Sequence, residues 1–322
     1  MILLPKYCLK DEHIMINPSQ PMARVAGQIK AVLCDLNDRV VYESPWSSNR
    51  ILDSGLDQIA ERIQNYGIIG DSDIAINDTQ TALGNQTQAT TSGANTSDSN
   101  YATGPLWALD HTKVHYFAAG TATTVKEFAV CGFQQQLDIY NRHLVSPWIP
   151  KSIDNILYMY MKHIVYPNLI DNTVIGTTIA GETFDVICRA MDVDRAIYNG
   201  SAESMTITTL GTGSSYQRHY PGDIGAITDI PAGSGETNYS TSSGAQAYGT
   251  GNHYRDWDFY AAINRANVPG GFLRSMMVPY TGSPMQIQFN ATSGPDIGKG
   301  IPKDDTKELN WTLRLNWDRY VP

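Results

Sequence analysis

Alternation of apolar and polar residues is the feature that most restricts how this chain can fold. Successive side chains of a β-strand point to opposite faces of a sheet, so a period of two predicts a strand with one buried face. The segment from residue 25 to residue 33 has this pattern. The clearest alternation lies near the end of the chain, where polar residues separate Leu309, Trp311, Leu313, Leu315 and Trp317. Both segments are therefore predicted to be strands that cover a core.

A β-hairpin followed by a short helix is predicted near the start of the chain. A first strand is predicted from Ala23 onward, with alternate residues from Val25 to Leu33 on one face, and the dipeptide Asn37-Asp38 favours a turn into a short return strand. Asp53 or Ser54 can cap a helix over residues 53–65, because a side-chain oxygen there accepts a hydrogen bond from a free backbone N–H.

Three other segments carry weaker patterns. Residues 79–104 are polar and contain one large aliphatic residue, Leu83, so we expect a long polar surface loop or hairpin excursion. Residues 155–166 are apolar at nearly every position, which predicts a strand buried between the core and a second layer or between subunits. Apolar residues at helical spacing predict a second short helix over residues 258–266.

These elements predict a mainly β protein, built of antiparallel β-sandwich or barrel-like domains with a few short helices. Three regions are expected along the chain. Residues 1–22 would form an irregular N-terminal arm, and residues 23–200 a β-sandwich-like domain that contains the first helix and the polar loop. Residues 201–322 would form a second β-rich region with loops rich in glycine, tyrosine and serine, closed by the C-terminal strand.

The composition limits the class of partner. The formal net charge is -9 and the lysines and arginines form no cluster, so nucleic acid is not an expected partner. No apolar stretch approaches the ~18 residues of a membrane span, so no membrane partner is expected either. The start of the chain lacks the features of a secretion signal, and the four cysteines show no paired spacing. We therefore expect synthesis in a reducing cytoplasm, with the cysteines reduced and mostly buried.

The sequence contains no complete motif for nucleophilic catalysis or cofactor binding. It has neither a G-x-S-x-G nucleophile motif nor a Walker A motif. Gly211 and Gly249 each begin a segment similar to a dinucleotide-binding loop, but tyrosines, Tyr216 and Tyr254, occupy the position of the third glycine. We therefore expect no cofactor.

Candidate metal ligands are also incomplete. His111 and His115 lie four positions apart, but along a strand they would be separated by ~13 Å, which is too far for one ion. Asp71, Asp73 and Asp78 match part of a calcium loop without its glycine and its terminal glutamate. No metal site is therefore predicted.

One pair of carboxylates stands beside an aromatic residue, as in many sugar-binding sites. Asp256 and Asp258 flank Trp257, and most glycosidases work with two carboxylates. The favoured interpretation is that Asp258 caps the second helix and that Trp257 packs in the core. Because no catalytic pattern is complete, we expect that the protein is not an enzyme and assign no catalytic residue.

The segment 211–256 has the composition of a binding loop. Its glycines support tyrosines, which supply large, rigid and amphipathic contact area. The segment is a candidate contact for a glycan or a neighbouring protein, and a solvated loop is the equally weighted alternative. The candidate binding-loop aromatics are Tyr216, Tyr220, Tyr239, Tyr248, Tyr254 and Trp257.

The segment VVYESPWSSNRILDSGLDQIAERI, residues 40–63, resembles a segment of structural proteins from tailed bacteriophages. In that family a short β-hairpin leads to P-W-x-x-N, then to I/L-L-D-x-G-L-D/N and a short helix. Looser matches follow at Glu127–Gly132, Asn141-Arg142 and Leu157–Tyr160, so the resemblance covers residues 25–190. The matching motif residues include Pro45, Trp46, Asn49, Leu52, Asp53, Gly55 and Leu56.

The resemblance implies a virion protein, made in the cytoplasm of the host bacterium. It gives the motif a scaffolding role, in which Gly55 permits a close turn into the helix and Trp46 is a large anchor. We favour a tail component, a fibre, collar or tail-tip protein, that binds copies of itself and other virion proteins. Only 17% of the residues are charged, against about 25% in typical domains, which favours packing between subunits. A capsid decoration or head-fibre protein, and a receptor-recognition protein that binds a host surface glycan, are the alternatives.

Overall fold

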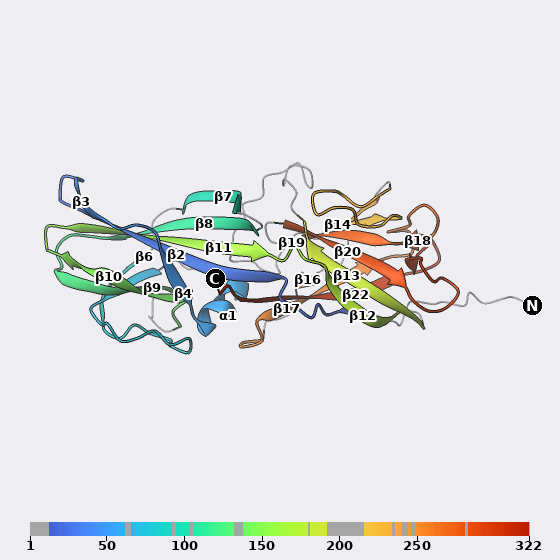
Figure 1. Ribbon diagram of the computed structural model, residues 1–322, viewed down its shortest axis with the longest axis horizontal. Coiled ribbons are helices and arrows are strands. Elements are labelled where there is room, and N and C mark those ends of the chain that lie inside the picture. The colour runs from blue at the N-terminus through green and yellow to red at the C-terminus, as the bar shows by residue number, and fades with distance from the viewer. Residues whose placement is uncertain are drawn as a thin grey trace, which may run out of the picture.

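The computed structural model shows an elongated protein made almost entirely of β-strands (Figure 1). The mainly β fold predicted from the sequence is confirmed, as layered and mostly antiparallel sheets whose described strands do not close into a barrel. In the described part of the chain, no helix is long and apolar enough to cross a membrane. The structure describes residues 13–61, 66–91, 95–103, 106–131, 138–179, 181–191, 216–233, 236–239, 244–245, 249–280 and 283–321.

The larger sheet contains fourteen strands. They are β1 (His13–Ile16), β2 (Ala23–Cys34), β3 (Val40–Glu43), β4 (Ser47–Ile51), β5 (Tyr66–Gly70), β6 (Gln86–Thr91), β7 (Asn95–Thr103), β8 (Leu106–Phe117), β9 (Thr123–Cys131), β10 (Asn141–Lys151), β11 (Ile156–Pro167), β16 (Gly244–Ala245), β17 (Tyr254–Ala261) and β22 (Leu309–Arg319). The main path runs β16-β17-β22-β2-β4-β10-β9-β5-β6. From β2 a branch leads through β11 and β8 to β7, while β3 pairs with β2 and β1 with β22.

The centre of this sheet is the ladder formed by β2, β11 and β8. β11 pairs along its whole length with β2 and, on its other side, with β8, which confirms the strand predicted for residues 155–166. Leu157 and Met159 point into the core and are buried, whereas Tyr158 and Tyr160 on the opposite face are half-buried. The second face of β11 is therefore partly open to solvent.

A six-stranded sheet forms the second layer, in the order β12-β13-β20-β19-β14-β15. Its strands are β12 (Asn172–Ile179), β13 (Glu182–Ala190), β14 (Tyr216–Tyr220), β15 (Glu236–Tyr239), β19 (Ser275–Tyr280) and β20 (Ser283–Ala291), and a separate pair is formed by β18 (Phe272–Leu273) and β21 (Ile301–Pro302). One continuous hydrophobic core joins Phe184 and Phe289 of this sheet to Phe259 and Trp311 of the larger one. The rings of Phe259 and Trp311 stack with centroids 3.9 Å apart.

The division into three regions predicted from the sequence does not match the sheets. β12 and β13, which precede residue 200, belong to the six-stranded sheet, while β22 belongs to the larger one. The expected arm over residues 1–22 needs correction in its described part, because β1 pairs in parallel with β22 and Ile14 and Ile16 are buried. Residues 1–12 lie outside the described residues.

The first predicted helix is present and the second is not. α1 (Asp53–Glu61) matches the described part of the helix expected over residues 53–65. The helix expected over residues 258–266 is wrong, because β17 runs to Ala261 and pairs with β22. Burial alternates along β17, with Trp257 and Phe259 facing the core. The alternation and the ladder hydrogen bonds together favour the strand.

The long polar loop expected over residues 79–104 contains two strands. β6 pairs with β5, and β7 pairs with β8, so the two polar strands extend different parts of the larger sheet. The correction has a simple cause: a strand at the edge of a sheet gains backbone hydrogen bonds from its neighbour even when it has few apolar side chains to bury.

Three of the cysteines, Cys34, Cys131 and Cys188, are free and buried, as expected for reduced thiols. Burial raises the pKa of the Cys34 and Cys188 thiols above the ordinary value, so both stay protonated and unreactive near neutral pH. Cys8 lies outside the described residues.

Candidate functional site

The motif residues hold α1 against the larger sheet. The Leu52 N–H donates to the Tyr140 carbonyl oxygen at 3.1 Å, and Trp317 Nε1 donates to the Leu56 carbonyl oxygen at 2.8 Å. Gly55 lies so close to the Tyr140 carbonyl that a Cβ at this position would collide with it. The glycine is therefore required by close approach of two backbones, and the two leucines fill the space beneath the helix.

Asn49 of the same motif is buried on β4, and its side chain reaches Met161 of β11. The Nδ2 atoms of Asn49 and Asn141 both donate to the sulfur of Met161, at 3.2 and 3.0 Å. Asn141 Oδ1 accepts the Val130 N–H at 2.7 Å. These contacts join β4 to the later strands β9, β10 and β11.

Pro45 and Trp46 lie at the surface. Trp46 is 38% exposed, and the Lys162 Nζ atom lies 4.6 Å from the centroid of its ring. The expected anchor thus packs against a cation on the outer face of β11, an attractive cation–π contact, and is not part of the core.

A buried ion pair links the two looser matches at Glu127 and Arg142. Both side chains are fully buried, with Arg142 Nη2 2.7 Å and Nε 2.9 Å from Glu127 Oε2. The carboxylate also accepts the backbone N–H groups of Gly84 and Asn85 at 3.1 and 2.9 Å, and Arg142 Nη1 donates to Gln80 Oε1 at 2.9 Å. The pair therefore fastens the segment between β5 and β6 onto β9 and β10.

A second set of ion pairs lies closer to the surface. Arg50 binds Asp78 through two hydrogen bonds of 2.6 Å. Arg319 contacts Asp78 at 3.1 Å and Asp53 of α1 at 2.7 Å. The Arg50 guanidinium, with Arg319 beyond it, holds the pKa of the Asp78 carboxyl below its ordinary value, so this carboxylate stays charged over a wide pH range.

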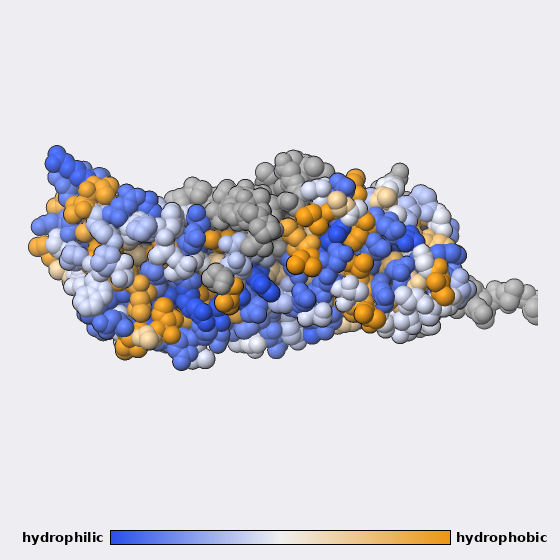
Figure 2. Space-filling model, in the orientation of Figure 1, coloured by the Kyte–Doolittle hydropathy of each residue, from blue (hydrophilic) through white to orange (hydrophobic). Residues whose placement is uncertain are grey.

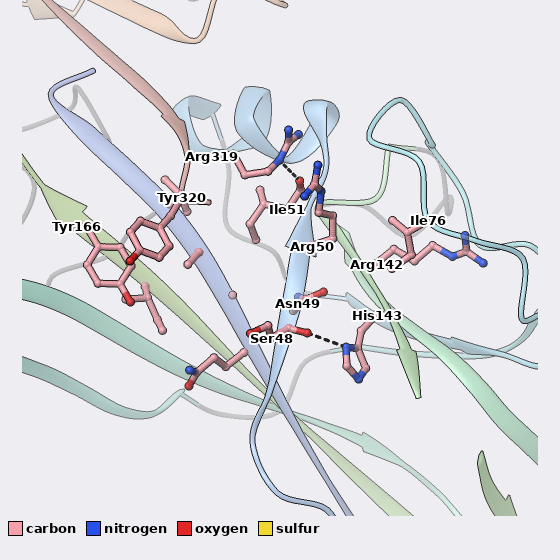
Figure 3. Close-up of a pocket in the computed structure, with 15 residues that line it drawn as sticks. Ser48, Asn49, Arg50, Ile51, Ile76, Arg142, His143, Tyr166, Arg319 and Tyr320 are labelled. Carbon is pink, nitrogen blue, oxygen red and sulfur yellow. Dashed lines mark hydrogen bonds between the residues drawn. The ribbon is translucent and has the colours of Figure 1, made fainter. Parts of the chain in front are cut away.

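These elements surround a groove of about 470 Å³ on the outer face of the larger sheet (Figure 3). Along the same edge, β2 pairs first with β22 through Ala23–Val25 and then with β4 through Gly27–Ile29. The groove lies at this change of partner, where β22 and β4 diverge. Tyr166 and Tyr320 lie on one side, with ring centroids 4.4 Å apart, and Arg50, Arg142 and His143 lie on the other (Figure 3). No sequence pattern pointed to the groove, because its residues come from separate segments of the chain.

A serine–histidine contact borders the groove. His143 Nδ1 lies 3.1 Å from the Ser48 carbonyl oxygen, and Nε2 lies 3.2 Å from Ser47 Oγ. Burial lowers the pKa of the imidazole, which weakens it as a base. Ser47 opens onto a space of only about 40 Å³, and its hydroxyl also lies 3.4 Å from the Ile29 carbonyl oxygen. This geometry positions β4 against β10 and leaves little room for a substrate.

The structure places two of the candidate binding-loop aromatics in the interior. Trp257 faces the core from β17, and the Tyr220 hydroxyl donates to the sulfur of Met277 at 3.4 Å. As contacts for a partner these two predictions are wrong, because the alternation of each strand turns the ring inward. Tyr254 is half-buried, with the Arg314 guanidinium carbon 3.6 Å from its ring centroid.

The other candidate aromatics are only partly described. Tyr216 of β14 and Tyr239 of β15 stand opposite each other in an antiparallel pair. Tyr248 lies outside the described residues.

The paired acids are occupied by neighbours across the sheet. Asp256 accepts two hydrogen bonds of 2.8 Å from Arg314, and Asp258 accepts one from the Thr312 hydroxyl. Asp258 therefore caps no helix. Over the described ranges, no three His, Cys, Asp or Glu side chains are grouped to hold a metal ion.

One end of the molecule exposes a set of apolar side chains, which we call the apolar tip. Hydrogen bonds join the Gly120 N–H to the Ile153 carbonyl oxygen at 2.7 Å and Asn155 Nδ2 to the Cys34 carbonyl oxygen at 3.4 Å, so the turns after β2, β8 and β10 meet. Figure 2 shows apolar surface over the β2–β3 hairpin at this end. The apolar tip consists of Leu36, Val40, Val41, Tyr116 and Ile153, each at least two-fifths exposed.

Comparisons of the chain with protein-family models, with curated proteins and with solved structures gave no match.

Proposed function

We propose that the chain is a structural subunit of a bacteriophage particle, placed in the tail, and that it acts through contacts with copies of itself and with other virion proteins. The apolar tip is the observation that carries the proposal. Apolar side chains that are exposed together at one end of a molecule are typical of protein–protein contacts. Val41 is 60% exposed on β3, and the hairpin that contains β3 projects from one end of the molecule, where a partner could cover it (Figure 1).

Two further observations support a structural role. The matched motif residues Asn49, Gly55 and Leu56 make packing contacts, as a scaffold motif should. The Glu127–Arg142 pair, which joins the looser matches, is sealed from solvent and fastens one segment of the chain to another. Both arrangements stabilise the shape of a subunit and present no reactive group.

Replacing Val41 by aspartate tests the contact. In solution, we expect the parent chain to form an oligomer by light scattering, and Val41→Asp to shift it toward the monomer, because a charge on the apolar tip opposes burial. Ile297→Asp is the matched control, since Ile297 is 65% exposed in the loop between β20 and β21. Equal oligomer fractions in all three proteins would refute self-association through the apolar tip.

Imaging of labelled protein in intact particles tests the placement. Labelling at the tail, at roughly tens of copies or fewer per particle, is the expected result. Labelling over the whole shell would instead identify a capsid decoration or head-fibre protein. Absence from the particle would refute the structural role altogether.

A further inference from the structure

The groove between β2, β4 and β22 has the size of a small-ligand site. Its volume of about 470 Å³ falls within the range of about 300–1,000 Å³ that is usual for such sites. We propose that this groove binds a neutral carbohydrate, either a single sugar residue or a short oligosaccharide. The inference is independent of where the chain sits in a particle.

The charges that line the groove are already neutralised. Arg50 is paired with Asp78, and the Arg319 guanidinium contacts both Asp78 and Asp53. Arg142 is paired with the buried Glu127. An anionic ligand would therefore have to displace an existing carboxylate, which disfavours phosphates and acidic sugars.

The groove also offers neutral hydrogen-bonding groups that the described chain does not use. The amide of Gln28, the hydroxyl of Ser48 and the phenol groups of Tyr166 and Tyr320 line it, and none makes a side-chain hydrogen bond to another described residue. Amide, hydroxyl and phenol groups both donate and accept, as the hydroxyl groups of a sugar do. These groups match a ligand that carries hydroxyl groups around the edge of its ring.

The two tyrosines give the groove an aromatic side. Their rings lie 32° apart in orientation, and the Tyr320 N–H donates to the Val25 carbonyl oxygen at 2.8 Å, which fixes the chain that carries the second ring (Figure 3). A pyranose ring presents C–H bonds on one face and hydroxyls at its edge. Tyrosine offers the same combination of apolar face and polar tip, so it suits such a ligand.

The backbone around the groove argues against a peptide as the ligand. A peptide commonly binds by adding a strand to a free sheet edge. Around the groove, β2 pairs with β11 on one side and with β22 and β4 on the other, through Val25 opposite Arg319 and Gly27 opposite Asn49. The edge that a peptide would need is therefore occupied by the protein's own strands.

The test is a titration of the full chain with neutral sugars. Glucose, galactose, mannose, N-acetylglucosamine and trisaccharides of each are the probes, detected by saturation-transfer NMR and quantified by calorimetry. We expect at least one to bind, and Tyr320→Ala and Gln28→Ala each to weaken that binding by about tenfold, the loss of one good contact. Tyr320→Phe removes only the hydroxyl and should weaken binding less.

Tyr158→Ala is the matched control. Tyr158 also lies on the outer face of β11 and also pairs with a second tyrosine, Tyr116, at 5.5 Å, but it is outside the groove. Its binding constant should stay within about twofold of the parent chain, and melting curves should show that every variant is folded. The proposal is overturned if no neutral sugar binds, if the groove variants bind as well as the control, or if N-acetylneuraminic acid or a peptide binds more tightly.

Discussion

Replacing Arg142 by methionine leaves the Glu127 carboxylate buried without its cation. The carboxylate keeps the N–H groups of Gly84 and Asn85 but loses both contacts with the guanidinium. Removal of one partner from a fully buried pair costs about 3–5 kcal/mol, because the remaining charge cannot be solvated. We therefore expect the free energy of unfolding in urea at pH 7.5 to fall by about that amount in Arg142→Met.

Arg50→Met is the control, because it breaks an ion pair whose arginine side chain is 45% exposed. Such a pair contributes about 0–1 kcal/mol. The double variant Glu127→Leu with Arg142→Met removes both charges, and its cost should be smaller than the sum of the single costs. The reasoning is refuted if Arg142→Met costs no more than Arg50→Met, or if the double variant is simply additive.

Three further predictions concern packing and protonation. Gly55→Ala should lower the free energy of unfolding by about 1–3 kcal/mol in urea titrations, since its methyl group collides with the Tyr140 carbonyl oxygen; an unchanged midpoint would contradict this. Phe259→Ala should cost about 3–5 kcal/mol through loss of the stack on Trp311, and a loss below about 1 kcal/mol would show that the core refills the space. Burial lowers the pKa of His115 to about 3, so below about pH 6.5 the unfolded chain binds a proton that the folded chain does not bind. The contribution of His115 to the free energy of unfolding is therefore complete above that pH and falls by about 1.4 kcal/mol per pH unit below it. His115→Phe should flatten this decline in urea midpoints measured from pH 7.5 to 5, and an unaltered slope would assign the decline to other groups.

Local patterns in the sequence predicted the strands that bury one face and the helix at Asp53. The period of two over β2 and β22 depends only on which side chains face the core, so it can be recognised without knowing which strands they pair with. The segment after Trp257 wrongly predicts a helix, because Phe259, Ala262 and Ile263 also have helical spacing. The pairing of β17 with β22 decides between the two, and that pairing is not encoded locally.

The groove could not be predicted for the same reason. Gln28, Ser48, Tyr166 and Tyr320 lie in four separate segments, and only the parallel pairing of β2 with β22 brings the last of them beside the others. The candidate tyrosines between residues 211 and 256 are distinguished only by the composition of their segment. Composition does not reveal which face of a strand a ring occupies, and the inward Tyr220 ring shows the consequence.

The position of β22 has a consequence for how the chain reaches its folded state. β22 lies between β1 and β2 on one edge and β17 on the other, and Asn316 accepts a hydrogen bond from Met22, 294 positions earlier. On the ribosome, β1 and the first residues of β2 therefore emerge long before β22, the neighbour that they share, is made. The rest of β2 can pair earlier with β3, β4 and β11, but the edge shared with β22 stays unpaired until β22 has been made, and contacts so distant in sequence form slowly. We expect chaperones to hold the growing chain, and chains that stop before Leu309 to aggregate rather than fold.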